Sequence, residues 1–203
     1  MAGKPKLFIA TPCGRMFPYE YVQSITTTLL KLYEKYALGV GLFESPLVYR
    51  NRNQLFAQAY KDGVDYILFV DSDMDWSPGD VDKLVALDKD IACGLYYSRK
   101  PVDQNRHLPM VMEYVDGQYE IAEVSDKPFL ISACGMAFTL IKRSVIEKMF
   151  EEYCEPFNPI ISNGDFLGED ISFCDRARNK GFEVWCNPDV KIGHLVTVSM
   201  GKE

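Results

Sequence analysis

The sequence predicts an α/β fold with a mostly parallel central sheet. Strand-like and helix-like segments alternate through the first half of the chain, and this β-α-β order favours parallel strands joined by right-handed crossovers, with helices on both faces. A run of apolar residues, 66–70, leads directly into two acidic residues, as a buried strand does at the edge of such a sheet. With 203 residues, 47% of them hydrophobic, the chain is long enough for one core, and we expect a single domain over residues 1–203.

The first half is predicted to contain strands and helices in strict alternation. Tyr21, Ile25 and Leu29 recur near the helical period, which indicates an amphipathic helix after the first strand. Asp62-Gly63 ends a later helix, since glycine favours the position after a helix C-terminus. The predicted segments are a strand at 7–11, a helix at 19–36, a weaker strand at 40–43, a helix at 53–61, a strand at 66–70, a helix at 80–87 and a strand at 91–94.

The second half has a different organisation. Asp116-Gly117 lies between two strand-like segments, 110–115 and 118–124, which is the pattern of a two-residue hairpin turn. We then expect a long apolar strand at 129–141, a helix at 144–150, a loop at 151–163 that could close over a bound ligand, a helix that ends near Asn179 and a strand at 182–187.

Composition argues against several classes of protein. A formal net charge of −7 and a pI near 5.0 argue against a nucleic-acid-binding surface. Leu130–Ile141 is the longest apolar run, and its twelve residues fall short of the roughly 20 that a membrane-spanning helix needs. The six cysteines form no C-x-x-C pair, and several lie in apolar runs, which is typical of buried free thiols in a reducing compartment. We therefore expect a cytoplasmic protein without a membrane span.

Two carboxylates, Asp71 and Asp73, follow the strand at 66–70 and form a D-x-D pattern. Ligands of open α/β sheets bind at the carboxyl ends of the strands, so these side chains are placed to hold a cation, a sugar hydroxyl or both. An acidic turn that caps the next helix is the alternative, but Ser77-Pro78-Gly79-Asp80 gives that helix a cap of its own. Two unit charges about 4 Å apart repel by about 4 kcal/mol at an effective dielectric of about 20, so an anionic ligand here almost requires a cation.

A second acidic pair, Glu169-Asp170, opens the helix that ends near Asn179. Acids in a first turn are favoured by the helix macrodipole, which is the structural explanation for both. Helical spacing separates them, because Asp170 shares its face with Phe173, Cys174 and Ala177 and therefore points along the more buried side. A carboxylate held near a partly dry cleft is a candidate general base.

His194, one of only two histidines, follows the last predicted strand and Pro188. A single histidine is more often a packing or surface residue than a ligand. His194 therefore indicates a metal site only in combination with the acids. Two carboxylates and one imidazole suit Mn²⁺ better than Mg²⁺, because nitrogen donors suit later transition metals while magnesium prefers oxygen. His107 lies beside a polar stretch and has no such context.

Taken together, these residues resemble the small GT-A fold glycosyltransferases of the family-2-like kind. A D-x-D pair alone is a weak signal, but its combination with G-E-D and a late histidine at these separations is rather specific and extends over nearly the whole chain. The resemblance rests on Arg52-Asn53, Asp71-Ser72-Asp73, Gly168-Glu169-Asp170, Trp185 with Pro188, and His194. It implies a GT-A (nucleotide-diphospho-sugar transferase) fold and a metal-dependent, hexosyltransferase-like enzyme.

The resemblance implies that a sugar moves from a nucleotide-diphosphate sugar, most simply a UDP-sugar, to an acceptor hydroxyl of a glycan, protein or small molecule, with inversion. In the family the second acid of the D-x-D, here Asp73, binds a divalent ion, Mn²⁺ or Mg²⁺, that bridges the donor diphosphate. Asp71 contacts the ribose or the ion through water, and His194 matches a late metal ligand. Asp170 matches the base that deprotonates the acceptor hydroxyl.

Further positions match the nucleotide-sugar site of the family. Thr11 corresponds to the exit of the first strand, Arg52 to an Arg-Asn pair near the nucleotide, and Gly135 to a glycine on the sugar and acceptor side. Glu169 is assigned to the same site. Because retaining GT-A enzymes share the D-x-D and the late histidine, inversion depends on Asp170 alone.

Two other functions compete with this interpretation. A haloacid dehalogenase-type phosphatase also begins with an apolar strand and D-x-D, but Met74-Asp75 replaces the residues expected after its motif. A non-catalytic nucleotide-sugar or glycan-binding module would keep the binding residues, although it would not need Asp170. Trp76 either stacks on a sugar or packs in the core, and Trp185 is expected in the core.

Overall fold

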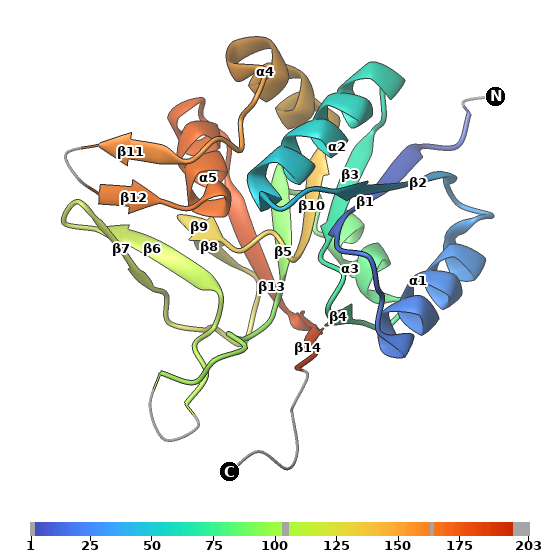
Figure 1. The fold of residues 1–203 in the computed structure, drawn as a ribbon, viewed down its shortest axis with the longest axis horizontal. Helices are drawn as coiled ribbons and strands as arrows, with labels where there is room; N and C mark the ends of the chain where they lie inside the picture. Colours follow the sequence, from blue (N-terminus) through green and yellow to red (C-terminus); the bar gives the residue numbers. More distant parts are fainter. Residues whose placement is uncertain (1–2, 103–105, 163–164, 197–203) are drawn as a thin grey trace.

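A computed structural model describes residues 3–102, 106–162 and 165–196, and its ribbon is drawn in Figure 1. A seven-stranded sheet in the order β2-β1-β3-β10-β5-β13-β8 forms the centre. Its strands are β1 (Lys6–Cys13), β2 (Ala37–Glu44), β3 (Tyr66–Val70), β5 (Ile91–Leu95), β8 (Phe129–Ile131), β10 (Phe138–Lys142) and β13 (Val184–Lys191). The helices are α1 (Tyr19–Leu32), α2 (Val48–Asp62), α3 (Asp80–Ala86), α4 (Arg143–Tyr153) and α5 (Glu169–Asn179).

The sheet is mixed, with most strands parallel. Strands β2, β1, β3, β5 and β13 run in one direction, while β10 and β8 run in the other. The carboxyl ends of the five parallel strands therefore lie at one edge. The predicted α/β fold is confirmed, and its mostly parallel sheet contains β10 as an antiparallel strand between β3 and β5.

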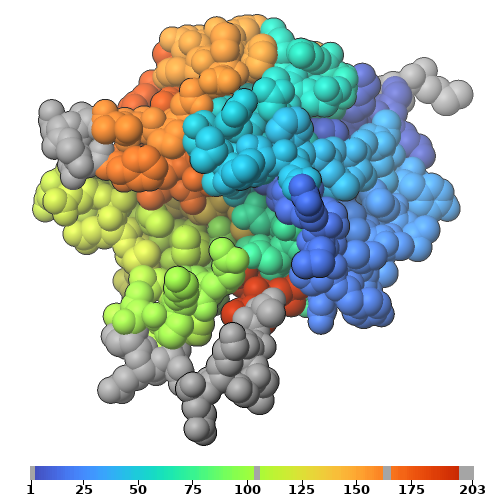
Figure 2. Space-filling view, in the orientation of Figure 1, coloured from blue at the N-terminus to red at the C-terminus, as the bar shows by residue number. Residues whose placement is uncertain are grey.

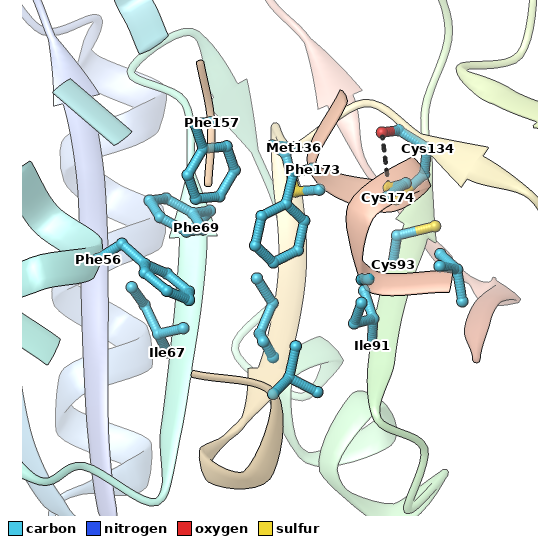
Figure 3. Close-up of a cluster of buried hydrophobic side chains, with 14 of the residues drawn as sticks. Phe56, Ile67, Phe69, Ile91, Cys93, Cys134, Met136, Phe157, Phe173 and Cys174 are labelled. Atoms are coloured by element: carbon cyan, nitrogen blue, oxygen red, sulfur yellow. Dashed lines mark hydrogen bonds between the residues drawn. The ribbon is translucent and has the colours of Figure 1, made fainter. Parts of the chain in front are cut away.

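Each face of the sheet is covered by its own layer of helices. Along β3 the side chains alternate: Ile67 and Phe69 pack against α2, α4 and α5, whereas Leu68 and Val70 pack toward α1 and α3. Both sets are fully buried. Figure 3 shows the first layer, in which Phe157 and Phe173 stack with ring centroids 4.4 Å apart. This packing fixes the strand ends that carry the polar residues.

The helix ends differ from prediction where local signals are weak. Helix α1 stops at Leu32, four residues before the predicted end at Tyr36, and α2 begins at Val48, five residues before the predicted start. The N-cap of α2 is Leu47, which offers no side-chain cap, so the sequence carried no start signal. Gly63 ends α2 in the left-handed region at φ 57°, as predicted.

The cap expected for α3 forms only in part, because the helix begins at Asp80 with Gly79 as its N-cap and no side chain caps its first turn. The Ser77 backbone N–H donates to Asp80 Oδ2 over 2.9 Å, which is the reciprocal bond of a capping box. This cap leaves Asp71 and Asp73 free of that structural task.

The single strand predicted at 129–141 is wrong, because the segment forms three strands in two sheets. Strand β8 lies at one edge of the large sheet, β9 (Ala133–Cys134) joins a small sheet, and β10 lies in the centre of the large sheet. The turns are buried as deeply as the strands, so hydrophobicity gave no sign of them. The change of sheet places Gly135 and Met136 at the same sheet edge as the acids.

The predicted hairpin is confirmed. Strands β6 (Val111–Val115) and β7 (Gln118–Ile121) pair antiparallel around Asp116-Gly117, whose φ values of 49° and 90° are those of a primed turn. Together with β9 they form the sheet β7-β6-β9. A second hairpin, β11 (Ile160–Ser162) with β12 (Asp165–Leu167), lies beside it in Figure 1.

The loop predicted at 151–163 is shorter than expected. Helix α4 continues to Tyr153, and β11 begins at Ile160, so only the segment between them is a loop; Asn163 lies outside the described residues. The last large strand, predicted at 182–187, runs over Val184–Lys191. This extension carries the chain to the sheet edge where His194 follows.

The two tryptophans differ in their burial. Trp76 is buried and donates from Nε1 to Thr28 Oγ1 over 2.9 Å, so it is a core residue rather than a sugar platform. The expectation of a core role for Trp185 is wrong, because its ring is half-buried, with Lys89 Nζ 4.0 Å from its centroid. All six cysteines are free thiols, as expected. Within the described residues, no helix combines the length and the apolar character needed to cross a membrane.

Candidate active site

A cleft of about 870 Å³ opens at the edge where the parallel strands end. Segments far apart in the sequence meet there: in Figure 2 the teal segment near residue 71, the light green segment near residue 100 and the red segment near residue 192 approach one another on this face. Six residues singled out from the sequence line the cleft: Arg52, Asp71, Asp73, Glu169, Asp170 and His194.

Asp71 is paired with Arg52. Arg52 lies on α2, is only 3% exposed, and donates from Nη2 to Asp71 Oδ2 over 3.1 Å. Burial lowers the pKa of Arg52, but Asp71 and Glu169 outweigh it and the pKa is raised. Burial raises the pKa of Asp71, and the Arg52 guanidinium opposes this rise. Arg52 Nη1 is buried and has no hydrogen-bond partner among the described residues.

Asp73 and His194 are brought together by a short strand pair. Strands β4 (Met74–Asp75) and β14 (Gly193–His194) pair antiparallel with His194 opposite Met74. The Leu195 N–H donates to the Asp73 carbonyl over 2.8 Å. As a result His194 Nε2 lies 3.5 Å from Asp73 Oδ2, although the two residues are far apart in the chain.

The imidazole of His194 has a defined orientation. Its Nδ1 lies 2.8 Å from the carbonyl oxygen of Tyr97; because a carbonyl only accepts, Nδ1 carries the proton. Nε2 is therefore the nitrogen that faces Asp73. Burial lowers the pKa of His194, but Asp73 and the Tyr97 carbonyl raise it overall. For Asp73 burial raises the pKa, and His194 together with Arg99 lowers it overall.

The second acidic pair lies across the cleft at the start of α5. Phe173, Cys174 and Ala177 are fully buried, which confirms the predicted face of this helix, and Asp170 is half-buried above them. Burial, followed by the charge of Glu169, raises the pKa of Asp170 to about 6, while its hydrogen bond from the Ile171 N–H opposes the rise. Glu169 Oε1 lies 3.4 Å from Arg52 Nε. Arg52 thus connects the two acidic pairs.

Thr11 and Gly135 are set back from the cleft wall. Thr11 is fully buried, and its hydroxyl lies 2.6 Å from the Tyr21 hydroxyl. A Cβ at Gly135 would lie 1.9 Å from Tyr96 Oη, so glycine is needed here for Tyr96 to reach the cleft. Their neighbours Pro12 and Met136 line hollows at this edge. Both residues therefore support the site from behind.

Several cleft residues were not predicted from the sequence. Tyr96, Ser98, Arg99 and Lys100 follow β5 and line the cleft. Arg99 Nη1 lies 2.9 Å from Asp73 Oδ2. Their position after a predicted strand of the same sheet could have identified them, because functional side chains gather at the ends of such strands.

A smaller hollow of about 270 Å³ adjoins the same acids. Pro12, Ser45, Asn51 and Asp71 are among the residues that line it. Asn51 is buried and donates from Nδ2 to the Ser45 carbonyl over 3.2 Å, while its Oδ1 has no hydrogen-bond partner among the described residues. A buried carbonyl oxygen of this kind is available to an N–H donor of a ligand.

The model of the family described as "Glycosyl transferase family 2" matches residues 31–150, more than half of the chain. The chain belongs to glycosyl transferase family 2. The family-2 match includes Arg52, Asp71, Asp73 and Gly135 and ends before Asp170 and His194.

Structural similarity agrees with the family-2 assignment. The chain is similar to a solved structure titled "Crystal Structure of A197 from STIV", with a TM-score of 0.63 and 18% identity over 95% of this chain and 86% of that chain. This likeness concerns the fold, which is the GT-A fold. Among curated proteins none matches the chain. The family-2 domain and the GT-A fold identify the protein as a glycosyltransferase.

Family-2 glycosyltransferases commonly bind a divalent metal ion, and part of the cleft fits one. Asp73 and His194 offer one oxygen and one nitrogen donor 3.5 Å apart. The Nδ1–H bond of His194 to a backbone carbonyl is the usual support of a metal-binding histidine, because it fixes the tautomer that leaves Nε2 free. Within the part of the chain that the structure describes, no cluster of three His, Cys, Asp or Glu side chains could hold an ion by itself.

Proposed function

We propose that this family-2 glycosyltransferase moves a sugar from a UDP-sugar to an acceptor hydroxyl, with a divalent ion and with inversion. The observation that carries the proposal is the composition of one cleft, in which the Asp73–His194 pair and Asp170 line the same space. The Asp73–His194 pair suits the binding of a diphosphate with its cation, and the Asp170 carboxylate suits the deprotonation of an acceptor hydroxyl. The same placement supports the proposal that residues 1–203 act as one catalytic domain.

The donor side is assigned to Asp73, His194 and Asp71. Asp73 and His194 would hold the ion, Mn²⁺ or Mg²⁺, which when bound neutralises charge on the leaving diphosphate. Because this pair supplies two donors, oxygens of the diphosphate and of water would complete the ligand set. Asp71 faces the same cleft but is held by Arg52, which suits a contact with ribose or with the ion through water.

The nucleotide itself is assigned to the adjoining hollow and its rim. The free Asn51 Oδ1 can accept an N–H from a nucleobase, and Arg52 Nη1 can donate to an anionic or hydroxyl oxygen. Glu169 belongs to this side through its contact with Arg52, while Thr11 and Gly135 act through the neighbours they position.

The acceptor side is assigned to Asp170. With a pKa of about 6, its carboxylate is ionised at neutral pH and is basic enough to take a proton from a hydroxyl as the new bond forms. Attack from the face opposite the leaving diphosphate gives inversion at the anomeric carbon. The acceptor is a hydroxyl of a glycan, a protein or a small molecule.

A thermal-shift panel tests the proposal. UDP, GDP and UDP-sugars are compared with Mn²⁺ and with excess chelator, in the parent and in Asp73→Asn. A ligand at about 100 times its Kd stabilises by about 2.7 kcal/mol, which at this chain length is a Tm shift of roughly 5–10 °C. We expect such a shift for UDP and one UDP-sugar with Mn²⁺ only, and its loss in Asp73→Asn. Equal shifts with and without chelator would contradict the metal assignment.

A further inference from the structure

Arg99 shares a carboxylate oxygen with the proposed metal site. Its Nη1 lies 2.9 Å from Asp73 Oδ2, and the same oxygen lies 3.5 Å from His194 Nε2. Arg99 follows β5 at the mouth of the cleft, and its side chain is 59% exposed. One oxygen of Asp73 therefore faces an exposed guanidinium on one side and the imidazole on the other.

A divalent ion held by Asp73 and His194 needs that oxygen. Ion-to-oxygen bonds in such sites are about 2.0–2.2 Å long, so a guanidinium nitrogen in hydrogen-bond contact with the same oxygen would lie beside the ion. Two like charges at that separation repel strongly. Arg99 and the ion are therefore competitors for Asp73 Oδ2.

The other arginine of the cleft cannot make this exchange. Arg52 is 3% exposed and is fixed by Asp71 and by Glu169. Arg99, in contrast, can turn away from Asp73 without loss of a buried contact, because most of its side chain is exposed. Lys100 lines the cleft beside it. The anion that a released guanidinium can meet in this cleft is the diphosphate of the donor.

We propose that Arg99 is an exchange residue, which pairs with Asp73 until the divalent ion takes that carboxylate and then pairs with the donor diphosphate. The inference rests on the proposed function and adds a residue and an order of events to it. The proposal therefore predicts that loss of Arg99 changes the affinities for the ion and for the nucleotide in opposite directions. Loss of Arg99 removes a competitor of the ion, and it also removes a partner of the nucleotide.

The test uses Arg99→Gln, with Lys100→Gln as the matched control. Lys100 lines the same cleft, and no ion pair joins it to a carboxylate of the described residues, so the control removes one charge without removing the contact to Asp73. Mn²⁺ affinity is measured without nucleotide from the free-ion EPR signal. UDP affinity is measured at saturating Mn²⁺ by calorimetry, and uridine, which has no phosphate, is measured beside it.

We expect Arg99→Gln to bind Mn²⁺ about 2–5-fold more tightly than the parent, the gain expected when a half-exposed ion pair no longer competes. We expect the same variant to bind UDP roughly tenfold or more weakly and uridine unchanged, because a charge-assisted hydrogen bond to phosphate is lost. Arg99→Lys should recover part of the UDP affinity. Lys100→Gln should change Mn²⁺ affinity less than Arg99→Gln does.

Two results would overturn the exchange: Mn²⁺ affinity that is equal or lower in Arg99→Gln, or UDP affinity that equals that of the parent. A further variant, Asp73→Asn, separates this failure from failure of the proposed function. If Asp73→Asn binds Mn²⁺ as the parent does, the metal site itself is wrong and the exchange falls with it. If Asp73→Asn loses Mn²⁺ while Arg99→Gln is unchanged, only the exchange is wrong.

Discussion

Arg52 donates a hydrogen bond from Nη2 to Asp71 Oδ2 over 3.1 Å, so the first acid of the D-x-D is held by a buried cation. The same guanidinium approaches Glu169 at 3.4 Å. One side chain of α2 thereby fixes both the end of β3 and the start of α5. This explains why Asp73, rather than Asp71, is the acid left to pair with His194.

Removal of Arg52 should destabilise the fold. Arg52→Gln leaves Asp71 partly buried without its cation, and we expect a loss of about 2–4 kcal/mol in the free energy of unfolding, because an uncompensated buried charge is costly. Urea denaturation measures the loss. The surface control Arg15→Gln breaks an exposed ion pair with Glu44 and should cost less than about 1 kcal/mol.

The partner substitution completes this test. In the double variant Arg52→Gln with Asp71→Asn, position 71 no longer carries an unpaired charge and only Glu169 still lacks its cation, so part of the lost stability should return. Strict additivity of the two single losses would show that Arg52 and Asp71 do not interact in the folded protein.

His194→Ala should weaken metal binding by the enzyme without unfolding it. His194 lies in a short strand at the surface edge, outside the hydrophobic core, so Tm should change little. We expect the Mn²⁺ concentration for half-maximal activity to rise by about 10–100-fold or more, since even outer partners of metal ligands contribute that much. His107→Ala is the control, and excess Mn²⁺ should partly rescue only His194→Ala. An unchanged rate at limiting Mn²⁺ would remove His194 from the ligand set.

Asp170 should lower stability at neutral pH. Its folded-state pKa of about 6 lies above the ordinary value of an aspartate, so the folded protein binds this proton more tightly than the unfolded chain does. The stabilising contribution is complete below about pH 4 and is lost as the pH rises through about 6. The free energy of unfolding of Asp170→Asn should therefore exceed that of the parent by about 1–3 kcal/mol at pH 7.5 and equal it near pH 4. The difference between the two urea transitions at each pH measures this contribution, and a difference independent of pH would contradict the raised pKa.

The large elements were predictable because their signals are local. Strand β3 was predicted with its bounds of Tyr66–Val70, since a run of five apolar residues ends at two acids. Helix α5 was predicted from its first-turn acids and from the helical spacing of Phe173, Cys174 and Ala177. The prediction of one strand at 129–141 was wrong because this stretch is mostly apolar throughout. Its turns are set by contacts with strands distant in the sequence, such as Ser132 N–H with the Met112 carbonyl.

The site was predictable to the extent that it depends on acids and a histidine. Arg52, Asp71, Asp73 and His194 were named from sequence, and they line one cleft. Arg99 was missed because an arginine in a polar loop has no periodicity, and its contact with Asp73 exists only after β3 and β5 are placed on either side of β10. Loop cations of this kind become visible only with the topology of the sheet.

The role of Asp170 as the catalytic base is tested most directly by comparing donor binding with transfer rate in Asp170→Asn. The substitution keeps the shape of the side chain and removes its basicity. We expect donor and Mn²⁺ affinities to stay close to those of the parent, while the single-turnover transfer rate falls by about 10²–10⁴-fold, the usual contribution of a positioned base. Glu169→Gln is the matched control on the same turn and should lower the rate less. Transfer at the parental rate by Asp170→Asn would contradict the account, because no base would then be assigned to the acceptor hydroxyl.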